Sequence, residues 1–465
     1  MKIDQNLKPA DLTSSVTRLF EIAQQKIPAL DQSWDFSKGA PVITVNGQYT
    51  SRGWTEWTQG FQFGSALLTF DATGDQSLLN LGRKRTLERM APHLTHTGVH
   101  DHGFNNLSTY GNLRRLMRES RIPHNEWEMN FYELAIKASG AVQAARWSGA
   151  PPMPSPITAN ASALGYIYSF NGPHSLFIDT MRTLRILCLS WQLGHSLHHE
   201  NDRRADLLKR AVLHGLASNQ FLLFHRSTSH TYDVKGRTAH EAVFSRNDGS
   251  FRCRSTQQGY SPFSTWTRGL AWAILGYAEL LEFFVTIPDE RFEQATTLKK
   301  SAVIAAFQQA ATETADHYLN DCTASDGIPY WDDGAPNLHK LGNWQSQPAN
   351  PYNDHEPVDS SAAAIAAQGL LRLGRQLTRS NYTQSGLTIA KTLLNEPYLS
   401  TSNTHQGLLL HSIYHRPNNW DHIPPNRKIP CNESSLWGDY HLLELSLMIH
   451  RLAKNQPYLT FFDQA

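Results

Sequence analysis

Apolar positions recur at helical spacing along most of the chain, and few segments alternate in the way that strands do. The helical pattern is clearest at residues 64–87, 177–222, 270–318, 361–394 and 440–452. Several of these blocks repeat one plan, in which a helix rich in small residues is followed by a short polar turn and a second amphipathic helix. One such turn contains Gly74, a residue type well suited to ending a helix. The pattern predicts an all-α fold, a toroid of helical hairpins.

Long non-helical stretches lie between these blocks, at residues 151–171, 228–263, 326–357 and 411–433. Connections of this length inside a compact domain are usually functional loops, so we expect them to gather at one mouth of a single domain. Residues 1–50 are expected to pack on the barrel as an N-terminal segment, residues 51–456 to form the barrel, and residues 457–465 to form a tail. The alternative is two all-helical domains divided near Thr228.

Composition and charge narrow the class of partner. Lys plus Arg number 42 and Asp plus Glu number 41, so neither a nucleic acid nor an anionic membrane is expected as a partner. The four cysteines are scattered and the N-terminus lacks the apolar core of a secretory signal, which favours the cytoplasm, or the periplasm if a signal was removed. The apolar stretch 269–287 is interrupted by Glu279 and Glu282, which predicts a buried helix rather than a membrane span.

Two aspartates stand out once familiar catalytic motifs are sought. The chain has no glycine-rich phosphate loop, His-Glu-x-x-His helix or Gly-x-Ser-x-Gly elbow. Asp101 lies in Gly-Val-His-Asp-His-Gly-Phe, and Asp179 lies in Phe-Ile-Asp-Thr-Met-Arg at the start of an apolar helix. An aspartate in that position is also explained as a helix cap, and for Asp179 taken alone the cap is the better interpretation.

Aromatic and polar residues form two further clusters. The first spans residues 54–61 and includes Trp57, and the second contains Arg268 and Trp272 one helical turn apart. An arginine flanked by tryptophan rings suits an acidic sugar, because the guanidinium pairs with a carboxylate and the indole covers a ring face. An arginine stacked structurally on a core tryptophan is an equal alternative.

Taken together and in order, these segments resemble the unsaturated glucuronyl hydrolases, glycoside hydrolase family 88. The matching motifs are Glu-Trp-Thr-x-Gly-Phe, His-Asp-x-Gly-Phe, Ile-Asp-Thr-Met, Gln-Gly-Tyr with Trp-x-Arg-Gly-x-Ala-Trp, Pro-Tyr-Trp-Asp, Asp-Ser-Ser-Ala-Ala-Ala-Ile-Ala and Glu-Ser-Ser-Leu-Trp-Gly-Asp-Tyr, at residues 56–61, 100–104, 178–181, 258–272, 329–332, 359–366 and 433–440. Each motif is weak alone, but seven in order are specific. They extend from Trp54 to Glu444.

The resemblance implies a fold, a substrate class and a set of site residues. The fold is an (α/α)6 barrel, and the substrate is a di- or oligosaccharide with a terminal 4,5-unsaturated uronate, acted on by a monomer or homodimer without metal or organic cofactor. Asp179 would be the general acid and base, and Asp101 its essential companion. Residues carried over for substrate binding are Trp57, His100, His230, Gln258, Trp266, Arg268, Trp272 and Ser360. His230 is the least secure of these, because His240 competes for its role.

The reaction explains the need for two carboxyl groups. The substrate is an enol ether, so protonation at C4 creates a cation at C5 to which water adds, and the hemiketal formed then opens and expels the second sugar. One carboxyl group donates the first proton and accepts one from the water. We therefore expect Asp179 to rest protonated, with its pKa raised by burial and by Asp101.

Departures from the family pattern concern the second sugar. The loop 411–430 contains Trp420, Arg427 and Lys428 but not the serine-and-lysine pattern with which some members bind sulfate. Arg427 and Lys428 stay candidates for an anionic neighbouring sugar. The rival functions are an unsaturated rhamnogalacturonyl hydrolase of the same barrel type, a conventional inverting glycosidase, and an inactive glycan-binding barrel.

Overall fold

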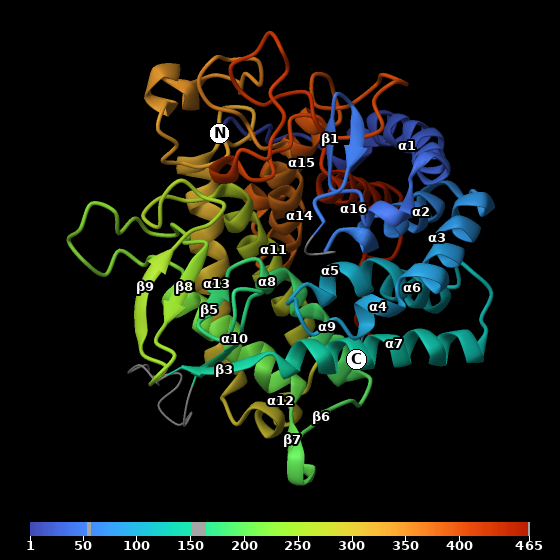
Figure 1. Ribbon diagram of the computed structural model, residues 1–465, viewed down its shortest axis with the longest axis vertical. Helices are drawn as coiled ribbons and strands as arrows, with labels where there is room; N and C mark the ends of the chain where they lie inside the picture. Colours follow the sequence, from blue (N-terminus) through green and yellow to red (C-terminus); the bar gives the residue numbers. More distant parts are fainter. Residues whose placement is uncertain (54–56, 151–163, 464–465) are drawn as a thin grey trace.

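The computed structural model describes residues 1–53, 57–150 and 164–463, and helices dominate this part of the chain (Figure 1). The α-helices are α1 (Thr13–Ser33), α2 (Gln59–Thr73), α3 (Gln76–Arg89), α4 (Ala91–Leu94), α5 (His102–Asn106), α6 (Asn112–Arg118), α7 (Glu126–Ala145), α8 (Thr180–Thr183), α9 (Arg185–Gln192), α10 (Leu207–Phe221), α11 (Thr267–Phe284), α12 (Asp289–Thr296), α13 (Lys300–His317), α14 (Ser360–Gln376), α15 (Ser380–Leu393) and α16 (Leu436–Ala453).

The strands are short and form small antiparallel sheets. They are β1 (Ile43–Val45) with β2 (Gln48–Thr50), β3 (Trp147–Ala150) with β4 (Leu164–Ile167), β6 (Leu197–His198) with β7 (Arg204–Ala205), and a three-stranded sheet in which β8 (Glu241–Phe244) lies between β5 (Ser175–Phe177) and β9 (Phe251–Ser255). In the three-stranded sheet Phe177 pairs with Glu241, so the residues that flank this pair, Ile178 and His240, lie side by side.

The helices form a closed ring of inner helices surrounded by outer ones. Around the ring α2 contacts α5, α5 contacts α8, α8 contacts α11, α11 contacts α14, α14 contacts α16, and α16 returns to α2. Each inner segment packs on an outer neighbour, as α2 does on α3 and α14 on α15. Figure 1 shows the outer helices α1, α3, α7, α10, α13 and α15 around this ring. The described residues therefore form the six-hairpin toroid that the periodicity predicts, and the predicted all-α class is confirmed.

Glycines in the motifs allow the inner helices to approach closely. A Cβ atom on Gly60 of α2 would lie 2.2 Å from the carbonyl oxygen of Asn105 in α5, and one on Gly103 of α5 would lie 2.3 Å from that of Thr183 in α8. No side chain fits at such distances. Both motifs thus contain glycine because neighbouring inner helices touch through their backbones there.

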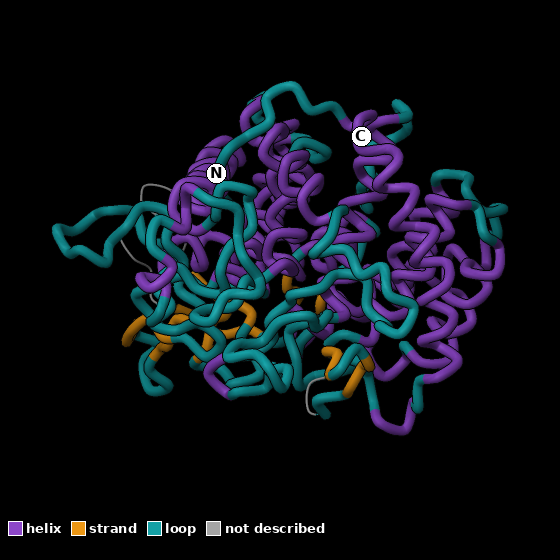
Figure 2. The backbone as a smooth tube through the Cα atoms, turned by 90° about the horizontal axis from the view of Figure 1, so that it is seen from above, coloured by secondary structure: helices purple, strands orange, loops and turns teal. Residues whose placement is uncertain are grey.

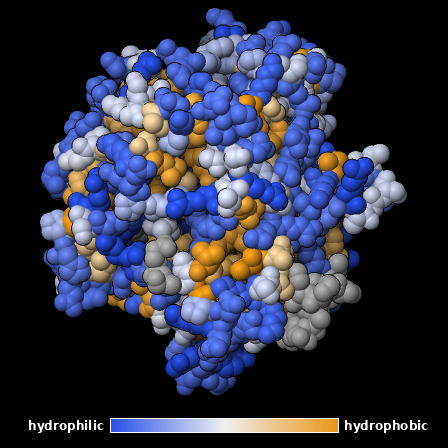
Figure 3. All heavy atoms as spheres, turned by 180° about the vertical axis from the view of Figure 1, so that it is seen from behind, coloured by the Kyte–Doolittle hydropathy of each residue, from blue (hydrophilic) through white to orange (hydrophobic). Residues whose placement is uncertain are grey.

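Strands and long loops gather on one side of the molecule, and helices fill the other (Figure 2). The face seen from behind Figure 1 is largely hydrophilic, with apolar atoms visible in hollows near its middle (Figure 3). The inner helices α5, α8 and α11 each begin with residues of the cavity described below, so their N-terminal ends meet at one mouth. The positive ends of the three helix dipoles therefore converge there.

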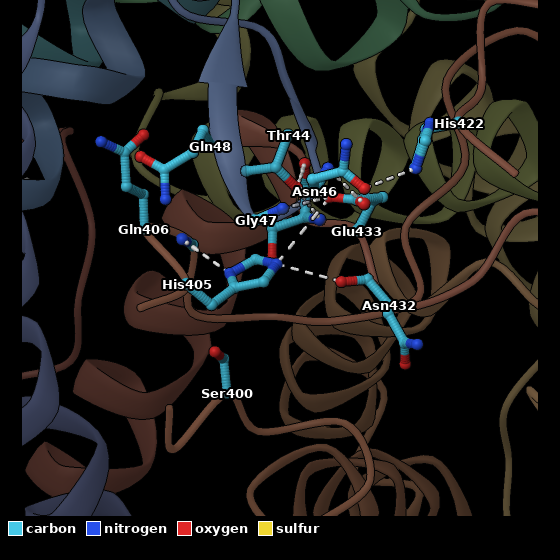
Figure 4. Close-up of polar contacts among 12 residues, drawn as sticks. Thr44, Asn46, Gly47, Gln48, Ser400, His405, Gln406, His422, Asn432 and Glu433 are labelled. Carbon is cyan, nitrogen blue, oxygen red and sulfur yellow. Dashed lines mark hydrogen bonds and ion pairs between the residues drawn. The ribbon is translucent and has the colours of Figure 1, made fainter. Parts of the chain in front are cut away.

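Glu433 fastens the N-terminal hairpin to the end of the barrel. Its carboxylate accepts hydrogen bonds from the Thr44 hydroxyl at 2.5 Å, the Asn46 backbone N–H at 2.8 Å and the Gly47 backbone N–H at 3.2 Å. Figure 4 shows His405 and Asn432 beside the same carboxylate. The first residue of the last motif thus joins β1 and β2 to the segment that leads into α16.

The first helix completes the outer layer around the ring, since α1 packs on both α2 and α16.

The division of the chain into residues 1–50, 51–456 and 457–465 stays a prediction. Among the described residues no single helix combines the length and apolar character that crossing a bilayer requires, and the one pair that does so jointly, α11 with α12, is bent by 119°.

Candidate active site

A cavity of about 650 Å³, its open mouth included, lies where the N-termini of α5, α8 and α11 meet. It is lined by Trp57, His100, Asp101, Phe104, Phe170, Asp179, Gln257, Gln258, Trp266, Arg268, Trp272, Tyr414, His415, Asn418 and Trp420. Eight of these residues were predicted for the site from the sequence, namely Asp101, Asp179, Trp57, His100, Gln258, Trp266, Arg268 and Trp272. Segments separated by up to several hundred residues therefore meet at one point.

The two aspartates occupy N-cap positions but do not act as caps. Asp101 precedes α5 and Asp179 precedes α8, and neither side chain makes a capping hydrogen bond. Instead Nε2 of His100 lies 3.1 Å from Oδ1 of Asp179 and 3.7 Å from Oδ1 of Asp101. The cap interpretation of Asp179 is thus wrong, because its carboxylate turns toward a histidine and the cavity.

His100 distributes charge unequally between the two carboxyl groups. Burial raises the pKa of Asp101 to about 6, with the charge of Asp179 adding to the rise. Burial also acts to raise the pKa of Asp179, but the charge and hydrogen bond of His100 outweigh it, and the pKa ends below its usual value. Burial opposes protonation of His100, yet the two carboxylates together raise its pKa. These opposite shifts favour a proton on His100 over one on Asp179.

This arrangement corrects the expected protonation state of Asp179. We expected a raised pKa from burial and from a second carboxylate, and the structure raises the pKa of Asp101 instead. The physical reason is the 3.1 Å contact with His100, which is shorter than the 3.7 Å contact that Asp101 makes.

Aromatic rings form one wall of the cavity. Trp57 stacks on Trp437, with ring centroids 5.0 Å apart and planes inclined by 27°, and Phe104 packs on Trp272 at 4.9 Å. Tyr414 lies 5.3 Å from Trp420 on the loop that covers this wall. An aromatic wall opposite ionisable groups suits a ligand with one apolar face and one polar edge, as a sugar ring has.

Arg268 is buried and largely committed to protein partners. One of its terminal nitrogens donates to Asp359 at 3.1 Å and to the Ile413 carbonyl, and the other donates to Gln258 at 2.6 Å and to the Tyr414 carbonyl at 2.8 Å. Its guanidinium also lies 4.6 Å from the ring of Trp266. Arg268 thus holds Gln258 and the loop around Tyr414 in place. It contributes positive charge to the cavity, while its N–H groups are mostly bonded to the protein.

His240 is the histidine that the fold places beside Asp179. Its carbonyl accepts a hydrogen bond from Ile178, and its ring lies 4.4 Å from that of Phe177. The Nδ1 atom accepts hydrogen bonds from the backbone N–H groups of Gln257 at 3.0 Å and Gln258 at 3.3 Å. The proton of the neutral ring must therefore be on Nε2, a buried atom without a hydrogen-bond partner among the described residues. Burial lowers the pKa of His240 to about 3, so this ring stays neutral.

The structure does not bring His230 into the cavity. Its ring is exposed and stacks on Tyr232 at 5.0 Å, in a separate surface hollow with Glu313 and His317. Placing His230 in the site was therefore wrong, and His240, which does not itself line the cavity, is the histidine of this segment that holds the lining residues Gln257 and Gln258. The strand register decides this, because it sets His240 directly beside Ile178.

Ser360 also lies outside the cavity lining. It begins α14 and its hydroxyl donates to the Leu410 carbonyl at 2.6 Å. Its neighbour Asp359 caps the same helix and accepts from Arg268, so this motif supports the site from behind. Trp54 and Glu56 of the first motif, and residues 151–163 of the first long loop, lie outside the described residues.

Several lining residues escaped sequence reasoning, namely Phe104, Phe170, Gln257, Tyr414, His415, Asn418 and Trp420. Phe104 ends a motif that had been noted for its aspartate. The others come from long loops, where only the density of aromatic residues around residues 414–420 gave a signal.

Comparisons with known proteins agree with this fold. No protein-family model matches the chain. Curated relatives include unsaturated glucuronyl hydrolases of Formosa agariphila (24% identical, covering 84% of this chain and 78% of the relative) and Bacillus sp. strain GL1 (26% identical, covering 87% and 89%), and an unsaturated chondroitin disaccharide hydrolase of Streptococcus pyogenes serotype M1 (24% identical, covering 88% and 84%).

Solved structures of the same enzyme share the fold. An unsaturated glucuronyl hydrolase specific for heparin matches with a TM-score of 0.67 at 20% identity, covering 95% of this chain and 98% of that one. A variant of such an enzyme with the tetrasaccharide dGlcA-Glc-Rha-Glc matches with a TM-score of 0.66 at 22% identity, covering 93% and 97%. The (α/α)6 barrel is thereby confirmed, and the relatives confirm the resemblance of this chain to the unsaturated glucuronyl hydrolases.

Proposed function

We propose that this protein is a glycosidase that releases a terminal 4,5-unsaturated uronic acid from a di- or oligosaccharide by hydration of the C4=C5 double bond. The observation that carries the proposal is the cluster of Asp101, His100 and Asp179 at the base of an aromatic-walled cavity. Neither aspartate side chain caps its helix, and both face His100, a group that can exchange a proton with them. Relatives with names that denote this activity cover most of the chain.

In this mechanism Asp179 delivers to the substrate a proton that it receives from His100. The hydrogen bond of 3.1 Å between them allows the proton to pass to the carboxylate without a net change in charge. A uronate carboxylate bound closer to Asp179 than to His100 raises the pKa of Asp179 by more than that of His100, and so favours that transfer. Asp179 then protonates C4, and its carboxylate accepts a proton from the water that attacks C5.

The other cavity residues have supporting roles in this proposal. Asp101 keeps His100 charged, because its carboxylate lies 3.7 Å from the ring nitrogen. His240 lies outside the lining, where its Nδ1 atom accepts from the backbone N–H groups of Gln257 and Gln258 and so positions these two lining residues. Trp57 and Trp272 cover the apolar side of the sugar.

A single assay separates this function from its rivals. Purified protein is mixed with unsaturated disaccharides made by polysaccharide lyases, and the ultraviolet absorbance of the conjugated alkene is followed. Hydration removes the absorbance as the second sugar is released. Release of sugar from saturated substrates without that loss would instead indicate a conventional inverting glycosidase, and faster turnover of unsaturated rhamnogalacturonides would indicate the other barrel class.

A further inference from the structure

Arg146 is a buried cation outside the lining of the cavity, at the residue that directly follows α7. It is 6% exposed, and it forms no ion pair with any residue that the structure describes. Burial lowers the pKa of Arg146, with Tyr168 and Asp101 acting in the opposite direction. A buried charge without a directly paired counter-charge costs free energy that its other contacts must offset.

The guanidinium of Arg146 bonds to backbone carbonyl groups of two separate segments. Its Nε atom donates to the Tyr168 carbonyl at 3.1 Å, and one terminal nitrogen donates to the Ser169 carbonyl at 2.6 Å. The other terminal nitrogen donates to the Thr97 carbonyl. Tyr168 returns a bond from its backbone N–H to the Arg146 carbonyl at 3.0 Å, and its ring lies 4.3 Å from the guanidinium. The planar fork of donors thus joins residues 168–169 to residue 97.

Both of these segments lead directly into the candidate active site. Thr97 comes three residues before His100 and four before Asp101, and Ser169 comes directly before Phe170. The ring of Phe170 stacks on that of His100, with centroids 5.9 Å apart and planes inclined by 28°. Arg146 therefore fixes the position of His100 relative to the ring that covers it.

The charge of Arg146 also acts on this part of the site. Burial raises the pKa of Asp101, and the charge of Arg146 is among those that oppose the rise. Burial opposes the protonation of His100 and the two carboxylates outweigh it, while Arg146 acts against the carboxylates. A neighbouring cation lowers the affinity of such a cluster for its proton.

The other ionisable groups around His100 add little to this balance. His214 in α10 and His240 directly before β8 are neutral, because burial lowers the pKa of each to about 3. Tyr414, on the loop across the cavity, is neutral because burial raises its pKa. The proton affinity of His100 is thus set by the two carboxylates on one side and by Arg146 on the other.

We propose that Arg146 is a positioning residue: its guanidinium holds the segment of His100 and Asp101 in place, and its charge makes their shared proton easier to release to the substrate. The inference rests on the proposed function, in which His100 supplies that proton to Asp179. Without the cation, two carboxylates beside one histidine hold the proton more tightly, and the cluster is a weaker acid. Proton transfer to carbon is fastest from an acid whose pKa lies near the working pH.

The test compares Arg146→Met with a matched control, Arg254→Met. Arg254 also donates to backbone carbonyls, those of Phe221 at 2.9 Å and Leu223 at 3.0 Å, and its guanidinium lies 3.9 Å from the ring of Phe224. It does not line the cavity. The two substitutions therefore remove the same kind of contacts, and only the first removes a charge that acts on the site.

We expect Arg146→Met to lower kcat on an unsaturated disaccharide about 100-fold, as displacement of a reacting group does. KM should stay within about twofold, as for substitutions that do not contact the ligand, because Arg146 does not line the cavity. The alkaline pH at which kcat/KM falls should rise by about one unit, since His100 keeps its proton to higher pH without the cation. A merely structural role would lower the unfolding midpoint in both variants and leave the pH profile in place.

Arg146→Lys separates the bonds from the charge, and it carries the test if Arg146→Met does not fold. The compact ammonium keeps the charge but cannot bond to three carbonyls at once. We expect kcat to fall about tenfold, less than in Arg146→Met, with the pH profile of the unsubstituted protein. A kcat unchanged by both substitutions, or a pH profile that Arg146→Met does not move, overturns the inference.

A titration of His100 by NMR needs no turnover. Histidine rings are labelled, and the signal of His100 is the one that His100→Gln lacks. A higher pKa of His100 in Arg146→Met supports the role of the charge, and an unchanged pKa in a protein that consumes the disaccharide overturns the inference alone. Absence of turnover in the unsubstituted protein overturns the proposed function, whatever this pKa is.

Discussion

Two buried sets of charged groups lie in this barrel, and they differ in how their charges are balanced. Deep among the inner helices, Arg182, Arg185 and Arg372 face Glu279, Glu282 and Glu444, with contacts of 2.6 Å from Arg182 to Glu279, 2.7 Å from Arg182 to Glu444 and 2.7 Å from Arg372 to Glu282. At the mouth, Asp101 and Asp179 share a single histidine. The first set is matched charge for charge, and the second has an excess of carboxylate.

Asp179 belongs to the unbalanced set and Arg182 to the balanced one, although they are only three residues apart at the start of α8. Arg182 is fully buried between two carboxylates that are themselves buried, whereas the side chain of Asp179 is 13% exposed toward the cavity. Buried charges that are all paired hold their side chains in one arrangement, whereas two carboxyl groups that share one histidine can exchange a proton with it. The comparison separates residues that hold the barrel together from those for which we propose a role in catalysis.

The largest effect is expected from Asp179→Asn, because the amide cannot carry the proton that C4 requires. Turnover of an unsaturated disaccharide should fall by at least about 10⁴-fold, the upper range for loss of a general acid and base, while the unfolding midpoint stays unchanged. The alkene absorbance measures turnover, and binding of intact disaccharide is measured by calorimetry. Turnover within tenfold of the unsubstituted protein would remove Asp179 from the mechanism.

The next effect tests the balanced set. Arg182→Met leaves Glu279 and Glu444 with uncompensated charge in the core, so the free energy of unfolding should fall by about 3–5 kcal/mol in urea titrations. The matched control is Arg83→Met, since Arg83 is partly exposed and lies 3.6 Å from Glu128. Exposed pairs contribute about 0–1 kcal/mol. Equal losses in the two variants would show that the inner network does not depend on its balance.

A smaller effect, on rate and on pH dependence, is expected from His100→Gln. Loss of the proton carrier should lower kcat/KM about 100-fold, a usual magnitude for one acid–base group. In the unsubstituted protein we expect kcat/KM to fall at alkaline pH as His100, whose pKa is raised, loses its proton; this fall is the alkaline limb of the pH profile. In the variant the proton must sit on a carboxyl group, which titrates lower, so the alkaline limb should move to lower pH. An alkaline limb at the same pH in both proteins would exclude His100 as the carrier.

The fold and the position of the two aspartates in one cavity were predictable, because both depend on local sequence patterns. Helical spacing with polar turns specifies hairpins, and Gly60 and Gly103 mark places where inner helices touch. The motif around Asp179 locates the carboxylate, but its protonation depends on the distance to His100, which no sequence spacing gives. From burial and a neighbouring carboxylate we predicted that the pKa of Asp179 is raised, whereas it is lowered. The histidine that outweighs both effects is 79 residues away in the sequence.

Loop residues were the least predictable part of the site. Tyr414, His415 and Asn418 reach the cavity on a loop that two groups hold in place: Arg268 donates to the carbonyls of Ile413 and Tyr414, and Asp421 accepts from the backbone N–H groups of Tyr414 and His415. A contact between residues so far apart in the chain produces no recognisable pattern in the sequence. The same limit explains the histidine error, since His230 and His240 lie in one irregular segment and only strand pairing distinguishes them.

The smallest expected effect is that of His230→Ala, and it is informative against His240→Ala. His230 is exposed and remote from the two aspartates, so its removal should change kcat/KM by less than about twofold, as surface substitutions do.

Removal of His240 takes away a buried donor beside Asp179 and the acceptor that holds the N–H groups of Gln257 and Gln258. We expect it to lower kcat/KM by about 10²–10³-fold. His240→Gln, which keeps a donor and an acceptor, should recover part of the loss, whereas a purely structural role would be reflected in the unfolding midpoint. A large loss in His230→Ala with none in His240→Ala would mean that the substrate-bound protein rearranges the whole segment between β5 and β9.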